Sequence, residues 1–169
     1  MAFLRNSKNI KSEINNIVKL KYKFIKIHPR ILRKSLSDVK FYTKVFNELK
    51  KTNLVIMWCT FDGWEDQPSE SNQINVIAGL IKIAKKNKIL LMHGGGPNIL
   101  KYYEKFRFIN RVFLDLSYTL VHYYGTSVEK DIAFLAKKFD KRIVIGCDYP
   151  TINLKKYFLI VKNLSKKAK

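Results

Sequence analysis

The sequence is poor in glycine, proline and cysteine, and it has no long apolar run. Seven Gly and four Pro in 169 residues exclude collagen-like and low-complexity chains. No apolar stretch approaches the roughly 18 to 20 residues of a membrane-spanning helix, and the first residues lack the apolar core of a signal peptide. We therefore predict no membrane partner. The two cysteines, Cys59 and Cys147, form no Cys-x-x-Cys pair, so we expect reduced thiols and a cytoplasmic location.

Acidic side chains are also scarce, since 13 Asp and Glu stand against 33 Lys and Arg and the formal net charge is +20. A surface of this charge attracts polyanions through electrostatics alone. However, only 6 of the cations are Arg, the usual residue in bidentate phosphate and base contacts, and the Lys residues are spread along the chain. We therefore favour a solvated surface over nucleic-acid binding. The 47% of hydrophobic residues suffices to bury the core of one domain over 1–169.

Apolar runs and amphipathic helical patterns alternate along the chain. The runs lie at 22–27, 54–59, 89–92, 112–116 and 143–145, and the helical patterns lie at 37–49, 72–84, 126–139 and 154–164. A further helical pattern within 1–20 precedes the first run. Apolar strands separated by helices are typical of a parallel sheet covered by helices. We predict an α/β fold of about five βα units, whose sheet edges at 22–27 and 143–145 are open for self-association or a complementary chain.

Polar side chains follow several predicted strands directly, where ligands bind in parallel α/β folds. His28, His93 and Asp148 come at equivalent strand ends, and imidazole and carboxylate together suit a divalent transition metal such as zinc. Taken singly, each could equally be a strand-end group held by hydrogen bonds. The glycines at 94–96 could offer N–H groups to an anion, although a tight turn is the favoured interpretation.

The segment after the second predicted strand combines aromatic and acidic side chains. Trp58 and Trp64 flank Asp62 there, and they could form the floor and rim of a ligand site. The alternative is core packing for the tryptophans and a solvated loop for the acid. His122 has no evident partner in the sequence, and we interpret it as structural.

Four segments together resemble a known family. They are 25–29 (Ile-Lys-Ile-His-Pro), 91–96 (Leu-Met-His-Gly-Gly-Gly), 112–117 (Val-Phe-Leu-Asp-Leu-Ser) and 143–150 (Ile-Val-Ile-Gly-Cys-Asp-Tyr-Pro). In order and spacing they resemble the fourth, sixth, seventh and eighth strands of the amidohydrolase-related metal-dependent hydrolases, a group that includes decarboxylases of aromatic acids. The resemblance implies an incomplete (β/α) barrel of the TIM type, corresponding to strands 4 to 8.

The resemblance also implies roles for single residues. Asp148 would be a metal ligand and proton acceptor, His93 would face the reacting group, and Cys59 stands where the family has a metal-binding histidine. The implied cofactor is a divalent metal, zinc. The implied partner is a small-molecule substrate, for which the candidate binding residues are His28, Trp58, Asp62, Trp64 and Ser117.

The chain departs from the family pattern because it has no His-x-His pair, which the family carries on its first strand. Catalytic zinc usually takes three protein ligands plus water. We therefore predict weak or no metal binding, and a truncated or split metal-dependent hydrolase acting on the carbonyl carbon of a cyclic ester, amide or carboxylic acid. The alternatives are a non-catalytic binding or assembly module on the same scaffold and a basic polyanion-binding protein.

Overall fold

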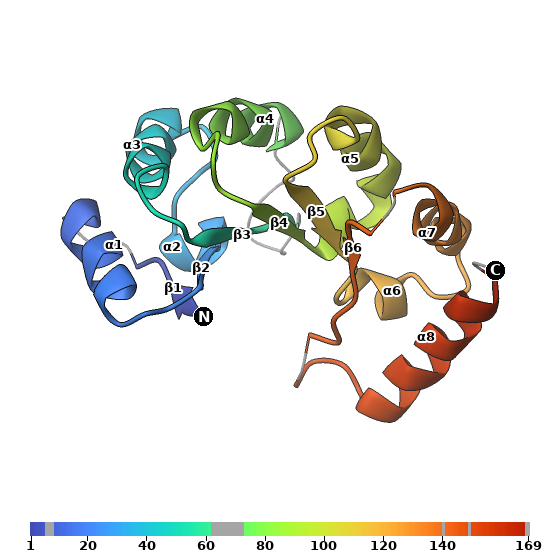
Figure 1. Cartoon of the computed structure of the whole chain (residues 1–169). Helices are drawn as coiled ribbons and strands as arrows, with labels where there is room; N and C mark the ends of the chain where they lie inside the picture. Colours follow the sequence, from blue (N-terminus) through green and yellow to red (C-terminus); the bar gives the residue numbers. More distant parts are fainter. Residues whose placement is uncertain (6–8, 62–72, 140, 149, 168–169) are drawn as a thin grey trace. The chain divides into compact units, whose positions relative to one another are not determined.

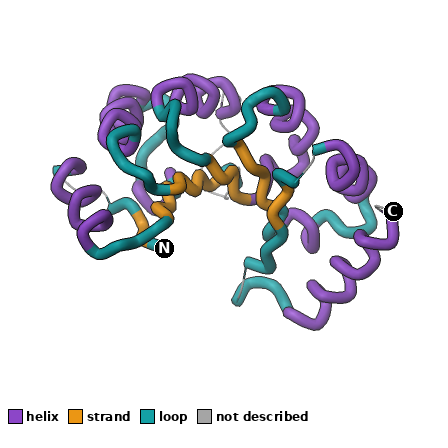
Figure 2. Tube along the Cα trace, in the orientation of Figure 1, coloured by secondary structure: helices purple, strands orange, loops and turns teal. Residues whose placement is uncertain are grey.

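The computed structural model describes residues 1–5, 9–61, 73–139, 141–148 and 150–167 (Figure 1). Strands and helices alternate along the chain (Figure 2). The strands are β1 (Ala2–Phe3), β2 (Phe24–Ile27), β3 (Val55–Cys59), β4 (Ile89–Met92), β5 (Val112–Asp115) and β6 (Ile143–Val144). The helices are α1 (Ile10–Lys19), α2 (Pro29–Leu32), α3 (Val39–Leu49), α4 (Gln73–Ile83), the 3₁₀ segment η1 (His93–Asn98), α5 (Ile99–Phe106), α6 (Thr119–His122), α7 (Ser127–Lys138) and α8 (Leu154–Lys167).

The strand order is β1-β2-β3-β4-β5-β6, so each strand lies beside its neighbours in sequence. The pairs β1–β2, β2–β3 and β5–β6 are parallel. The predicted α/β fold with a parallel sheet is therefore confirmed. Within the described ranges, no helix combines the length and the apolar character that crossing a bilayer requires. The chain separates into two compact units, Met1–Leu90 and Leu91–Lys169.

In the first unit, alternate side chains of β2 and β3 are buried under helices. Ile27 of β2 pairs with Trp58 of β3, and their side chains are 0% and 1% exposed. The Trp58 ring packs against Tyr42 and Phe46 of α3, with ring centroids 5.1 and 5.8 Å away. Phe24 lies an odd number of positions from Ile27, so it points to the opposite face, where it is exposed. The core of this unit therefore lies between the strands and α3.

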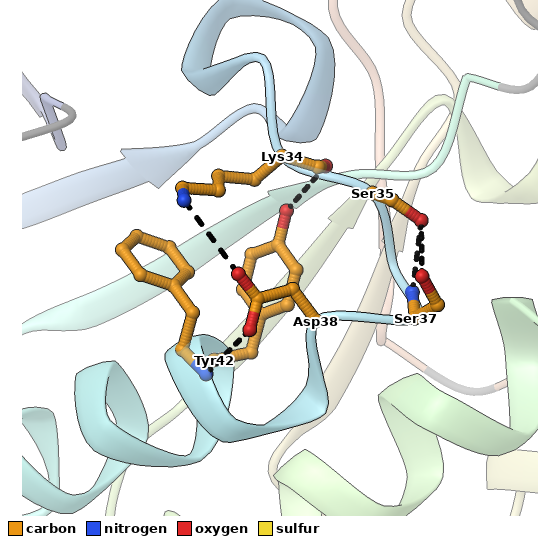
Figure 3. A network of polar contacts seen from close by, with 6 residues as sticks. Lys34, Ser35, Ser37, Asp38 and Tyr42 are labelled. Carbon is orange, nitrogen blue, oxygen red and sulfur yellow. Dashed lines mark hydrogen bonds and ion pairs between the residues drawn. The ribbon is translucent and has the colours of Figure 1, made fainter.

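Polar contacts fix the first turn of α3 (Figure 3). Asp38 is the N-cap residue, and its Oδ1 accepts a hydrogen bond from the Phe41 N–H at 3.1 Å. Its Oδ2 lies 3.6 Å from Nζ of Lys34, whose carbonyl accepts a hydrogen bond from the Tyr42 hydroxyl at 2.9 Å. These contacts hold the Tyr42 ring where it meets Trp58.

A buried asparagine joins two turns of the first unit. Asn87, which is 2% exposed, precedes β4. Its Nδ2 donates to the carbonyls of Leu49, Thr52 and Leu54, at 3.2, 3.1 and 2.9 Å. Leu49 ends α3, and the last carbonyls of a helix have no partner inside it. Asn87 therefore joins the end of α3 to the turn before β3, and the Leu49 carbonyl also accepts from the N–H and the hydroxyl of Thr52.

In the second unit, Leu114 of β5 pairs with Ile143 of β6. Helices α5 and α7 pack against each other, and α6 packs against η1 and α8. Figure 1 shows α8 beside α6 in this unit. The buried face of α8 consists of Tyr157, Ile160 and Leu164.

The structure adds one strand to the five apolar runs of the sequence. β1 pairs with β2, joining Phe3 to Lys26 in register, and the Leu4 N–H donates to the Lys26 carbonyl at 2.9 Å. The edge predicted to be open at 22–27 is therefore paired, and that expectation is wrong. A strand of two residues is too short to produce a periodic pattern. The helix expected within 1–20 is α1, which lies between β1 and β2.

Candidate functional site

Buried polar residues meet at the ends of β4 and β5 in the second unit. His93 follows β4, Asp115 ends β5, and Ser117 and Thr119 come shortly after it. Their exposed fractions are 5%, 3%, 3% and 1%. Leu116 lies in the hydrophobic core, so the alternation of an extended chain turns Asp115 and Ser117 to the same face. We call His93, Asp115, Ser117 and Thr119 the strand-end network.

Hydrogen bonds connect every member of the strand-end network. The Asp115 carboxylate accepts from the Ser117 N–H at 3.1 Å and from the Ser117 hydroxyl. It also lies 3.5 Å from the His93 N–H. The Thr119 hydroxyl donates to the His93 carbonyl at 2.6 Å. Both the backbone and the side chain of His93 are thus held by residues of the neighbouring strand.

These contacts assign the tautomer of His93. Its Nδ1 lies 2.9 Å from the backbone carbonyl of Ser117, which can only accept a hydrogen bond. The Ser117 hydroxyl lies 3.4 Å from the same nitrogen, but its proton goes to Asp115. Nδ1 therefore carries the hydrogen, and in the neutral ring the lone pair is on Nε2. A histidine held in this way presents Nε2 as a base or as a ligand.

The carboxyl group of Asp115 is the buried charge of the network. Burial raises the pKa of Asp115 above its usual range, because a desolvated carboxylate is disfavoured. The hydrogen bonds from Ser117 and the neighbouring His93 act in the opposite direction and lower that pKa. Asp115 is therefore held by its partners in a position that burial alone would make unfavourable.

A sharp turn follows β4 and carries His93. The φ angles of His93, Gly94, Gly95 and Gly96 are +64°, +56°, +84° and +56°. Left-handed backbone is easy for glycine and strained for other residues. At Gly95 a side chain is also excluded by space, because a Cβ there would lie 2.9 Å from Cγ of Tyr102 and still nearer to two other ring atoms. The glycine run therefore makes a tight turn against α5, in agreement with the favoured interpretation.

Aromatic rings extend from the network. The His93 and Tyr118 rings meet edge to face, with centroids 6.1 Å apart. Tyr118 stacks on His122 at 4.7 Å with 18° between the planes, and His122 meets the Tyr123 ring at 4.8 Å. Burial, and to a smaller degree Tyr118, raises the pKa of the Tyr123 phenol. His122, which the sequence left without an evident partner, thus packs between two tyrosines.

The segment after β6 passes beside the network. A Cβ at Gly146 would lie 3.3 Å from Oδ1 of Asp115. Asp148 follows two positions later, is half-buried and has a φ of +54°. Tyr157 of α8 lies near the same groups. Burial raises the pKa of its phenol, and electrostatic interactions with Cys147 and Asp115 raise that pKa further. Asp148 therefore follows a segment that contacts the network.

The other predicted site residues lie in the first unit or outside the described residues. Trp58 is part of the core against α3, a position that does not suit a ligand contact. His28 follows β2, and its Nδ1 is buried without a hydrogen-bond partner among the described residues. Cys59 ends β3 as a buried cysteine that is not in a disulfide. Asp62 and Trp64 fall outside the described residues.

The donors expected for zinc are not brought together. Within the part of the chain that the structure describes, no three His, Cys, Asp or Glu residues are grouped to hold a metal ion. In the second unit, His93 uses Nδ1 as a donor, and its neighbour Asp115, which was not a predicted ligand, is engaged by Ser117. Because catalytic zinc takes three protein ligands, the described residues do not fit the metal that the resemblance implies.

Comparison with known proteins supports the fold and goes no further. No protein-family model and no curated protein matches this chain. Among solved structures, it is similar to the crystal structure of an uncharacterized TIM-barrel protein, Bb4693, from Bordetella bronchiseptica, with a TM-score of 0.71 and 16% sequence identity. The match covers 93% of this chain and 62% of that chain. The chain thus has the α/β fold of a TIM barrel and spans less than two thirds of that protein's length.

The sequence predicted His93 and Ser117 as site residues, but not Asp115 and Thr119 as their partners. Asp115 had a usable signal, because it is a carboxylate inside an otherwise apolar run. Buried carboxylates are rare unless they are paired. Thr119 had no such signal in the sequence, because a threonine after a strand is common in turns.

Proposed function

We propose that this chain is a TIM-barrel hydrolase of the amidohydrolase-related type, which acts on the carbonyl carbon of a small-molecule ester or amide and releases the carboxylic acid. His93 is the residue that faces this carbon. The observation that carries the proposal is the fixed orientation of its ring, whose Nδ1–H is held by the Ser117 carbonyl at 2.9 Å. Nε2 is then the nitrogen that can take a proton.

In the proposed reaction, water adds to the carbonyl carbon and His93 Nε2 takes a proton from it. The bond between the carbonyl carbon and the leaving oxygen or nitrogen then breaks, and His93 returns the proton to the leaving atom. Asp115, when ionised, stabilises the imidazolium between these two steps. No step is assigned to a metal, because the described donors do not fit one. Asp148 enters the proposal as a second polar group, supported by the position of Gly146, where an added Cβ would lie 3.3 Å from Oδ1 of Asp115.

One observation favours an alternative, which is a non-catalytic binding module on the same scaffold. The donors for a catalytic metal are not grouped within the described residues. In this alternative the strand-end network binds a carbonyl or carboxylate ligand, and no turnover follows.

The test compares hydrolysis of dihydrocoumarin and p-nitrophenyl acetate by the whole chain and by its variants. His93→Asn is the decisive variant, because asparagine tolerates the left-handed backbone that His93 adopts. Lys130→Asn is the control, since it changes an exposed residue of α7 outside the strand-end network. We expect turnover that His93→Asn and Asp148→Asn reduce at least about tenfold and that Lys130→Asn leaves unchanged.

The other possible results distinguish the hydrolase from the non-catalytic binding module. Turnover that survives His93→Asn would refute the assigned role of His93. Absence of turnover in the native chain, with or without added zinc, would refute the hydrolase. If His93 ring resonances then still shift on addition of a carboxylate, the binding module is supported instead.

A further inference from the structure

The backbone at Tyr118 adopts a rare and strained conformation. Its φ and ψ angles are 65° and −57°, and the N–H of Thr119 donates to the carbonyl of Ser117 at 2.7 Å. This is a γ-turn with positive φ, which is uncommon because it strains any residue that carries a side chain. Residues in such conformations persist only where the surrounding structure holds them, and they gather at ligand sites.

The γ-turn and the strand-end network share one atom. The carbonyl oxygen of Ser117 closes the γ-turn and also accepts the hydrogen bond from His93 Nδ1. The turn that strains Tyr118 is therefore the same turn that orients the His93 ring. Relaxing the backbone at Tyr118 would move the acceptor on which the tautomer of His93 depends.

The strained backbone also decides where the Tyr118 ring lies. The ring is half-buried, meets His93 edge to face and has one face covered by His122 at 4.7 Å. His122 is exposed, so it supports the Tyr118 ring from the solvent side. A ligand that reaches Nε2 of His93 thus has an aromatic side chain as its neighbour.

We propose that Tyr118 is a specificity-determining residue, which the strained γ-turn holds beside His93 so that its ring contacts the planar part of a ring-bearing carboxylate or carbonyl ligand. This inference rests on the proposed role of His93 as the ligand-facing group. The inference gives the backbone strain a function. Glycine at position 118 would form the same turn without strain, so the tyrosine ring is the reason for a strained residue there.

The first experiment measures the strain with paired variants. Tyr118→Gly and Tyr118→Ala both remove the ring, but only glycine relieves the backbone. We expect the thermal midpoint of Tyr118→Gly to exceed that of Tyr118→Ala by about 2–8 °C. The control pair is Lys130→Gly and Lys130→Ala on the exposed side of α7, where the order must reverse. The strain is refuted if alanine is the more stable variant at both positions.

The second experiment measures ligand preference by the shift of the His93 ring resonances, assigned by their loss in His93→Asn. The probes are benzoate, which has a planar ring, and cyclohexanecarboxylate, which has a similar size and a puckered ring. We expect the native chain and Tyr118→Phe to bind benzoate about three- to tenfold more tightly, as aromatic contacts of this kind allow. Tyr118→Gly should bind both probes equally.

The outcomes separate this inference from the proposed function. If both probes shift the His93 resonances equally in the native chain, or if Tyr118→Gly keeps the preference for benzoate, the role of Tyr118 is refuted while that of His93 stands. If neither probe shifts these resonances in the native chain, both proposals fail.

Discussion

Replacing Gly95 by alanine tests the tight turn that carries His93. Two costs arise together, because the φ of Gly95 is +84° and a Cβ there would lie 2.9 Å from Cγ of Tyr102. The Tyr102 ring is 4% exposed and packs against Phe106 at 6.1 Å, so it has little room to withdraw. Two other ring atoms would lie still nearer than Cγ, so the ring must move by more than about 1 Å to restore carbon–carbon contacts of about 3.5–4.0 Å.

The two costs can be given magnitudes. Left-handed backbone costs an alanine about 1–2 kcal/mol relative to glycine. Overpacking a filled core costs a further ~1–3 kcal/mol. We therefore expect Gly95→Ala to lower the free energy of unfolding by about 2–5 kcal/mol, a large part of the ~5–15 kcal/mol that is typical of whole domains. The measurement is urea denaturation followed by far-ultraviolet circular dichroism.

Gly125→Ala is the matched control. Gly125 has a φ of +82°, but nothing lies within 4 Å of a Cβ built there. It should therefore show the backbone cost alone, and the difference between the two variants measures the clash with Tyr102. In a Tyr102→Ala background, Gly95→Ala should cost no more than Gly125→Ala. Equal losses for Gly95→Ala and Gly125→Ala in the native background would refute the packing of Tyr102 on the turn.

Three further substitutions test other parts of the structure. Gly79→Ala, on the exposed side of α4 with nothing within 4 Å of the added methyl, should raise the free energy of unfolding by ~0.5–1 kcal/mol; a loss would mean that this position is not helical. Trp58→Phe should cost less than ~1.5 kcal/mol, because it removes a buried N–H that has no hydrogen-bond partner among the described residues, whereas Trp58→Ala should cost about 3–5 kcal/mol; equal costs in thermal unfolding would contradict the core role. For Asp115→Asn, the raised pKa means that the folded state binds this proton more tightly than the unfolded state. The stability of the native chain relative to the variant should therefore fall as the pH rises from the unfolded value of 3.8 through the folded pKa of Asp115, and a relative stability that rises over this window in urea titrations would show that the sign is wrong.

The parallel α/β fold could be predicted because its elements are long enough to be periodic. The run at 54–59 and the helical pattern at 37–49 correspond to β3 and α3 within two residues. In contrast, β1 has two residues, while α2 and α6 have four each, and such elements form through tertiary contacts that leave no periodic pattern.

The candidate site could be predicted only in part, because strand-end position does not determine direction. Trp58 and Cys59 are adjacent at the end of β3, and consecutive residues of a strand point to opposite faces. Trp58 points toward α3, as its contacts with Tyr42 and Phe46 demonstrate. The run at 54–59 is apolar at every position, so the sequence has no alternation that shows which face Trp58 occupies. The strain at Tyr118 also left no signal, because no residue preference marks a turn that disfavours every side chain.

The strand-end network explains why chemistry and strain occur at the same place in this chain. Asp115 and Ser117 share a face because they are two positions apart, and β4 places His93 beside them. A buried carboxylate in this position needs donors, and Ser117 supplies both an N–H and a hydroxyl. The γ-turn follows immediately, and its strain falls on Tyr118. The orientation of the His93 ring and the strain at Tyr118 are therefore linked, because the Ser117 carbonyl that accepts the hydrogen bond from His93 Nδ1 also closes the γ-turn.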